Sequence, residues 1–148
     1  MSPYIYVAHF FSCFFMTGLI WLIQLIHYPS YKFIDALKFS EYQNFHTTTI
    51  TFIVGPVMAI ELFSGMAILF DQKLSALSSI NFIGLLLIWA ATAFLSVPLH
   101  AKLSAGFNTE TVQMLISTNW VRTVLWSLRS ALLIYFILTF WSSNELAK

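Results

Sequence analysis

Four long apolar stretches, separated by short polar segments, make up most of the chain. They cover residues 4–28, 41–70, 79–104 and 119–141, and each is long enough to cross a bilayer, for which about 20 apolar residues suffice. A spanning segment must satisfy its own backbone hydrogen bonds, so these stretches are expected to be helices. Short connections place consecutive helices side by side in opposite directions. The pattern therefore predicts an all-α fold, an antiparallel four-helix bundle in the membrane, with one domain over residues 1–148.

Local signals indicate where the predicted helices begin and end. Pro29 follows the first stretch as a stop, because proline cannot continue a helix without losing a backbone hydrogen bond. Before the second stretch, Ser40 and Gln43 match the capping-box pattern, in which the two side chains bind amides at the helix end. Residues 109–117 are predicted to form a short surface helix ahead of the fourth stretch.

The composition indicates that the solvent of these helices is lipid. Hydrophobic residues make up 59% of the chain and charged residues 9%, and the mean hydropathy is +0.80. Soluble chains carry about 25% charged residues, and a chain this short could not bury so much apolar surface in water. A net charge of +1 provides no basic surface for a nucleic acid. The single cysteine, Cys13, excludes an intrachain disulfide and a dithiol centre.

The basic residues at the ends of the spans predict the orientation in the membrane. With four spans, both termini lie on the same side. The other side carries Lys32, Lys38, Lys102 and Arg122, whereas the side of the termini carries Lys73 and Lys148. The positive-inside rule then predicts a multi-pass protein of the cell inner (cytoplasmic) membrane with both termini outside. The first apolar run is too long for a signal peptide and has no basic residue before it, so we expect it to be retained.

The fourth stretch carries two arginines on one face. Asn119, Arg122, Trp126 and Arg129 follow spacings of three and four, so they form one stripe along the helix. Such a stripe turns polar groups away from lipid and into the bundle. Glu61 is the one acidic residue well inside an apolar stretch, and its depth differs from that of Arg129 by about 5 Å. We expect these two residues to pair, either to fix helix register or as part of a site.

Three histidines occur where spans begin or end, all on the side opposite the termini. His27 ends the first span, His46 begins the second and His100 ends the third, whereas His9 lies at the other side and is expected to be structural. The sequence therefore predicts one polar cluster inside the bundle that opens toward the side of the three histidines. Its expected members are Gln24, His27, His46, Glu61, His100, Asn119, Arg122 and Arg129.

The first hypothesis for this cluster is a metal- or haem-binding redox protein. His46 and His100 would be the ligands of haem b or of a transition metal (iron, copper or zinc). Glu61 would be a third ligand or a catalytic proton acceptor, while Arg122 and Arg129 would hold propionates or an oxyanion. The chain has no sequential ligand motif such as HExxH or CxxC, so whether it is an enzyme stays open.

Two alternative hypotheses need no cofactor. In one, the protein is a non-enzymatic binder or carrier of a quinone, a lipid or a small organic anion, and the polar head group contacts Gln24, Asn119, Arg122 and Arg129. Four spans are few for a transporter, so this alternative predicts a homodimer. In the other, the protein is a structural or accessory membrane subunit, and the polar cluster serves only packing.

The polar residues also form a wider pattern in four segments. These segments are QLIHYPSYKFIDALKFSEYQNFH, GPVMAIE, VPLHAKLSAGF and NWVRTVLWSLR. Together they resemble a family of small uncharacterised (hypothetical) bacterial four-span integral membrane proteins, which implies an architecture but no activity. The matching positions are Gln24, Tyr28, Pro29, Tyr42, His46, Pro56, Glu61, Pro98, His100, Asn119, Trp120, Arg122 and Arg129. A looser similarity in size and number of spans links the chain to anthrone-oxygenase-like membrane proteins, which is an analogy of fold alone.

Overall fold

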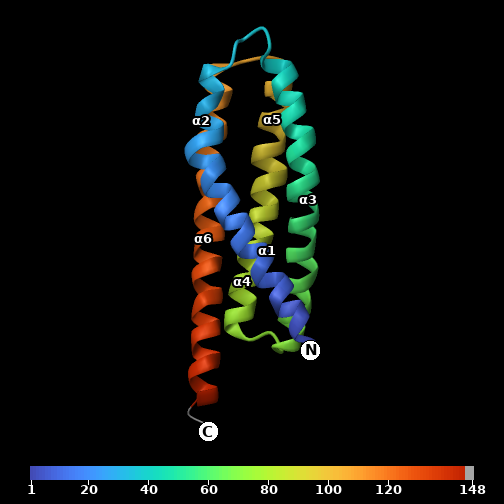
Figure 1. Cartoon of the computed structure of the whole chain (residues 1–148), viewed down its shortest axis with the longest axis vertical. Coiled ribbons are helices and arrows are strands. Elements are labelled where there is room, and N and C mark those ends of the chain that lie inside the picture. The colour runs from blue at the N-terminus through green and yellow to red at the C-terminus, as the bar shows by residue number, and fades with distance from the viewer. Residues whose placement is uncertain (146–148) are drawn as a thin grey trace.

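Four helical rods make up the structure, a computed structural model that describes residues 1–145, with the side chains of residues 1–139 (Figure 1). In chain order the elements are α1 (Pro3–Leu22), η1 (Ile23–His27), α2 (Tyr28–Ser30), η2 (Tyr31–Phe33), α3 (Phe39–Asp71), α4 (Ala76–Ala91), η3 (Thr92–Ser96), α5 (Val97–Ser104) and α6 (Thr109–Glu145). The first rod runs from α1 to η2, the second is α3, the third runs from α4 to α5, and the fourth is α6. Lys148, one of the two basic residues on which the predicted side of the termini rests, lies outside the described residues.

Each rod is long and apolar enough to cross a membrane. The candidate spans are Pro3–Phe33, Phe39–Asp71, Ala76–Ser104 and Thr109–Thr139. Consecutive rods run in opposite directions, so the predicted all-α antiparallel four-helix bundle is confirmed (Figure 1). By the length and hydropathy of its helices, the chain is a multi-pass membrane protein. Its inner-membrane location and the side of its termini stay predictions.

Apolar side chains cover the outside of the bundle, while many polar ones lie within it. Phe11 is 66% exposed and Phe94 is 77% exposed, whereas Gln24, Glu61 and Asn119 are buried. In water this distribution would be unfavourable, because large apolar side chains would stay solvated while polar groups lost their hydration. In a bilayer it is favourable, since lipid solvates the outer face and the bundle satisfies the polar groups.

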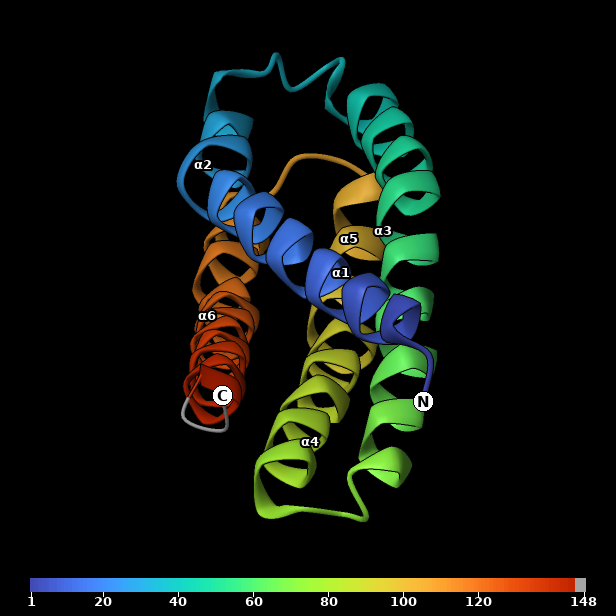
Figure 2. The ribbon, with the colours of Figure 1, turned by 60° about the horizontal axis from the view of Figure 1, so that its bottom comes forward.

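The first rod crosses the bundle at an angle, so it meets different partners along its length. Figures 1 and 2 show α1 running from the side of α3 toward α6, and its contacts are mainly with these two helices. The helix α4 packs chiefly against α6, while α5 packs against α3 and α6. All four rods thus contribute to one interior.

Two π-helical turns interrupt the first and third rods, each two residues before a proline. In η1 the amide of Tyr28 binds the carbonyl of Ile23, and in η3 the amide of Val97 binds that of Thr92. Pro29 and Pro98 lie inside the helices that follow. A π-turn absorbs the clash and the lost hydrogen bond that proline brings, and such turns are frequent at functional sites. The prediction that Pro29 ends the first helix is therefore wrong, because the rod continues to Phe33.

Two other local predictions differ from the structure. The helix α3 begins at Phe39 with no side-chain cap, so the capping box of Ser40 and Gln43 is absent and Gln43 is buried instead. Residues 109–117 do not form a separate helix, because α6 continues without a break from Thr109 to Glu145.

Candidate functional site

Among the described residues, most of the side chains predicted to form one polar cluster belong to two separate clusters in the interior. We name the first the ion-pair cluster, which consists of His9, Glu61, Ser64, Asn81 and Arg129. We name the second the arginine–histidine cluster, which consists of Gln24, Tyr28, Gln43, His46, His100, Asn119 and Arg122. Trp126 lies between them. The prediction that Glu61 and Arg129 join the histidines of the opposite side is therefore wrong.

In the ion-pair cluster, the charges of Glu61 and Arg129 neutralise each other. One guanidinium nitrogen, Nη1, pairs with the Glu61 carboxylate, which is 0% exposed. The Nε and Nη2 atoms donate to the backbone carbonyl and the side-chain oxygen of Asn81, both at 3.1 Å. Trp126 donates its indole N–H to the other carboxylate oxygen at 3.2 Å. Every guanidinium nitrogen has a protein partner, so the cluster leaves little for a ligand to bind.

His9 belongs to this same cluster, although its sequence position suggested an isolated histidine. Its Nδ1 atom lies 3.1 Å from the Ser64 hydroxyl and 3.2 Å from the Glu61 carbonyl, and Nε2 lies 3.4 Å from the Asn81 side-chain oxygen. Gly65 makes room for the ring, because a Cβ atom there would lie 2.9 Å from the imidazole carbon Cε1. The angled path of α1 brings His9 to α3 and α4, which depth alone could not predict (Figure 2).

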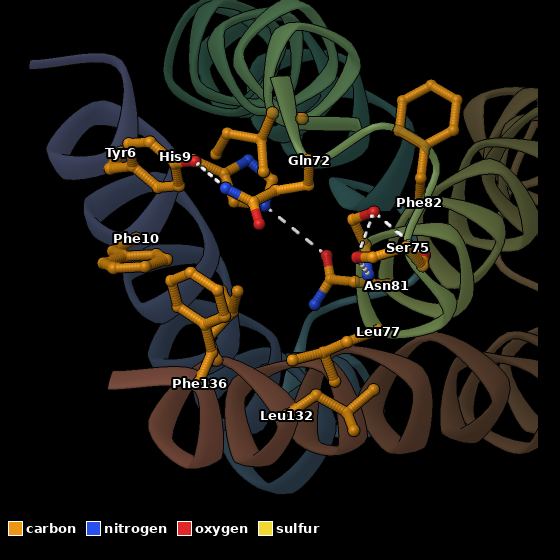
Figure 3. Close-up of a pocket in the computed structure, with 14 residues that line it drawn as sticks. Tyr6, His9, Phe10, Gln72, Ser75, Leu77, Asn81, Phe82, Leu132 and Phe136 are labelled. Atoms are coloured by element: carbon orange, nitrogen blue, oxygen red, sulfur yellow. Dashed lines mark hydrogen bonds between the residues drawn. The ribbon is translucent and has the colours of Figure 1, made fainter. Parts of the chain in front are cut away.

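A small cavity lies beside His9 at the end of the bundle where α1 begins. Its volume is about 40 Å³, and Figure 3 shows His9 and Asn81 on its wall together with the rings of Tyr6, Phe10 and Phe136. A cavity that holds one benzene molecule measures roughly 150 Å³, whereas one water needs about 10–15 Å³. This cavity is therefore large enough for a few water molecules and too small for an organic ligand.

The arginine–histidine cluster is a chain of hydrogen bonds that joins all four rods. Gln24 accepts from the Asn119 amide at 2.7 Å and donates to the Ile116 carbonyl at 3.1 Å. Asn119 accepts from the Arg122 guanidinium, whose Nη2 also donates to the Tyr28 hydroxyl at 3.3 Å. The sequence therefore identified Gln24, Asn119 and Arg122 as neighbours correctly.

His46 and His100 lie close together, as predicted, but in different chemical surroundings. Their ring centroids are 5.7 Å apart. Gln43 donates to Nδ1 of His100 at 2.7 Å, and the Tyr28 hydroxyl lies 3.0 Å from Nε2, so both ring nitrogens are occupied. The ring of His46 lies against that of His27 in a tilted arrangement with centroids 4.2 Å apart, and its nitrogens have no hydrogen bond to a described residue. A role for Gln43 in this cluster was not predicted, because a helix cap appeared to account for its side chain.

No group of three or more His, Cys, Asp or Glu side chains among the described residues could hold a metal ion. Glu61 cannot serve as a third ligand beside His46 and His100, because it belongs to the other cluster and pairs with Arg129. Ligation of a metal or haem by His46 and His100 alone stays a prediction, and it would require His100 to give up a hydrogen bond.

A large cavity adjoins the arginine–histidine cluster. Its volume is about 490 Å³, within the range of about 300–1,000 Å³ that is typical of small-molecule sites. One end is polar, with Tyr28, His46, His100 and Arg122 on the wall. The rest is mainly apolar and extends toward the middle of the bundle, where the lining includes Met16, Ile20, Met58, Trp89 and Trp126. The cavity is therefore amphipathic along the direction of the bundle axis.

Two residues that line the cavity each contain a buried donor with no hydrogen-bond partner among the described residues. The donors are Nε of Arg122, a side chain that is 7% exposed, and the indole nitrogen of Trp89. Leaving a buried donor unsatisfied costs about 1–3 kcal/mol, so most buried donors in proteins have an acceptor. Both atoms are themselves covered by protein, so an acceptor inside the cavity would reach them only after the side chain changed its conformation.

The cavity is open to the lipid-facing surface between α3 and α5. Thr51 of α3 and Val97 and Ala101 of α5 are exposed side chains that also line it. The gap lies next to the π-turn η3, whose residues Thr92 and Ser96 form part of the wall. A molecule dissolved in the bilayer could therefore enter from the side.

Comparison of the chain with known protein families, curated proteins and solved structures finds no match. The resemblance to small bacterial four-span membrane proteins therefore stays a prediction, and the structure supports only its four long apolar helices.

Proposed function

We propose that the protein binds a single amphiphile with a compact anionic head group, such as a carboxylate or a phosphate. The head group contacts Arg122 at the polar end of the large cavity, and the apolar tail occupies the remainder. The observation that carries this proposal is the buried side chain of Arg122, which lines a cavity of ligand size and has no carboxylate partner among the described residues.

The charge balance of the interior supports an anion. The two buried arginines differ, because Arg129 is neutralised by Glu61, whereas no carboxylate among the described residues pairs with Arg122. A buried charge without a counter-ion is costly, and an anion in the cavity would remove that cost. The cavity lining includes no Asp or Glu that could repel such an anion.

The shape of the cavity supports an amphiphile. The polar end lies near the membrane interface reached by His46 and His100, and the apolar end lies nearer the middle of the bundle. A lipid-derived molecule in the adjacent leaflet has the same arrangement, with its head at the interface and its tail inward. The volume is about three times the 150 Å³ or so that holds one benzene, which corresponds to roughly 20 non-hydrogen atoms.

The test measures binding of radiolabelled hexadecanoate to the full chain in phosphatidylcholine nanodiscs. We expect saturable binding of one molecule per chain, competition by hexadecyl phosphate, and weak competition by uncharged hexadecanol. Arg122→Gln should lower the affinity at least 10-fold, since hydrogen bonds to charged groups contribute about 1.5–3 kcal/mol. Lys102→Gln, which removes an exposed positive charge from α5 outside the cavity lining, is the matched control and should leave binding unchanged.

Two results would contradict the proposal. One is the absence of saturable binding of both hexadecanoate and hexadecyl phosphate, and the other is unchanged affinity in Arg122→Gln. The same samples test the redox hypothesis through their metal content and absorption spectrum. A stoichiometric metal or haem that disappears in both His46→Ala and His100→Ala would favour that hypothesis instead.

A further inference from the structure

We propose that Trp126 sets the length of the tail that the large cavity accepts, and that the Glu61–Arg129 ion pair holds its indole ring in place. This inference rests on the proposed binding of an amphiphile. It assigns Trp126 to tail selection, and it makes Glu61 and Arg129 positioning residues rather than residues that contact the ligand.

Trp126 lies between the large cavity and the ion-pair cluster. It follows Arg122 by one helical turn on α6, and Arg129 follows by about one turn more. Trp126 lines the cavity, whereas neither Glu61 nor Arg129 does. Its side chain is 0% exposed, and its indole N–H binds the Glu61 carboxylate at 3.2 Å. The indole therefore forms the wall that separates the apolar end of the cavity from the buried charges.

The contacts behind Trp126 hold this wall rigidly. Arg129 occupies one Glu61 carboxylate oxygen, which leaves the other oriented toward the indole. Asn81 in turn binds two nitrogens of the guanidinium. The stem of Arg129 lies against Gly84, where a Cβ atom would be 3.1 Å from the arginine Cγ and Cδ atoms. Asn81 thus holds the Arg129 guanidinium, Arg129 holds the Glu61 carboxylate, and Glu61 holds the indole of Trp126. Supporting contacts of this kind fix the position of a binding residue.

Two other side chains at this end of the cavity are more adaptable than Trp126. Met16 and Met58 also line it, and methionine is unbranched and readily changes conformation. Such residues accommodate tails of different shape but do not define a fixed limit. The Trp126 ring does define a fixed limit to tail length, because it is large and is anchored by a hydrogen bond to a buried ion pair.

The test measures the affinities of n-alkanoates from decanoate to docosanoate by competition with radiolabelled hexadecanoate in the same nanodiscs. The native protein should show an optimum, with affinity falling at least 10-fold for chains that are too long. Trp126→Ala should move the optimum to chains longer by about four carbons, because removing a buried ring leaves a cavity. Trp126→Phe, which keeps a ring but lacks the N–H, should broaden the optimum while leaving short-chain affinity within about 2-fold.

Trp120→Ala is the matched control, because Trp120 is also on α6 but is 41% exposed and packs against Trp21 at the surface. It should leave the chain-length profile unchanged. An optimum that does not move in Trp126→Ala would overturn the assignment, even if Arg122-dependent binding is intact. Absence of saturable binding of both hexadecanoate and hexadecyl phosphate in the native protein would instead refute the proposed function, so the two failures can be told apart.

The role of the ion pair is tested separately with Glu61→Gln combined with Arg129→Met, which removes both charges. The double variant should broaden the chain-length profile as Trp126→Phe does, while hexadecanol stays a weak competitor. If the profile keeps its native sharpness in a folded double variant, the ion pair does not position the indole.

Discussion

At the scale of single residues, Arg122 and Arg129 show how the same side chain on one helix face can have two roles. Arg129 meets a carboxylate and an asparagine, and its three nitrogens all have protein partners. Among the described residues, Arg122 bonds to two neutral groups, an amide and a phenol, and its Nε atom has no partner. The first arrangement is typical of a structural ion pair, and the second is typical of a site for an external anion.

The partnership of Glu61 and Arg129 predicts a specific pattern of stability in detergent. Glu61→Gln should lower the free energy of unfolding by about 3–5 kcal/mol, because it leaves a buried cation without a counter-ion. Combining it with Arg129→Met should recover part of this loss. The measurement is a denaturation series monitored by circular dichroism, with the exposed Glu41→Gln on α3 as control. If the losses of the two single variants simply add in the double variant, the residues are not coupled.

The sequence indicated some members of each cluster because charge is conspicuous in an apolar helix. Glu61 and Arg129 could be paired by depth, and His46 and His100 by their positions at neighbouring span ends. Asn81 was not recognised because it is a single neutral polar residue near the start of a span, and Gln43 was not recognised because it was assigned to a helix cap. Tyr28 entered only through the resemblance. Its role depends on a contact between rods, and a one-dimensional pattern carries no information about that contact.

At the scale of elements, the decisive features are the angle of α1 and the two π-turns. The number and approximate extent of the helices follow from hydropathy, because a bilayer leaves few other solutions. The angle of α1 does not follow from hydropathy, since it depends on how small and large side chains pack between the helices. It brings His9 against Gly65, and this close contact joins the first rod to α3.

The contact between α1 and α3 predicts opposite effects for two glycine substitutions. Gly65→Ala should destabilise the bundle by about 1–3 kcal/mol, because the added Cβ would lie 2.9 Å from the His9 ring. Gly18→Ala on α1 meets no atom within 4 Å and should stabilise by up to about 1 kcal/mol through helix propensity. Thermal unfolding in detergent compares the two. A neutral Gly65→Ala would mean that α1 and α3 do not approach so closely.

At the scale of the whole molecule, the bundle is polar inside and apolar outside, with a large cavity in one half and a small one at the other end. The ion-pair cluster and Trp126 lie between the two cavities. Trp126 thus separates the ion-pair cluster from the arginine–histidine cluster, and the prediction of a single polar cluster did not include this separation. Residues on one stripe of α6 face the same interior, but they are separated along its length by the indole of Trp126.

The orientation of the bundle would determine which leaflet supplies the proposed amphiphile. The large cavity lies in the half that ends at the loop around Leu37, and the positive-inside rule places this half toward the cytoplasm. Cysteine labelling tests this in a Cys13→Ser background, since Cys13 is the single native thiol. Leu37→Cys and Leu74→Cys then each place one thiol in an exposed loop at opposite ends.

In intact cells a membrane-impermeant maleimide should label Leu74→Cys but not Leu37→Cys, and permeabilisation should expose both. The expected result would direct the cavity and its lateral opening toward the inner leaflet, so that an anionic amphiphile would reach Arg122 from the cytoplasmic side. The reverse labelling would place the arginine–histidine cluster at the outer surface. The proposed binding of an amphiphile would remain, but its source would then be the outer leaflet, and the basic residues would not have set the orientation.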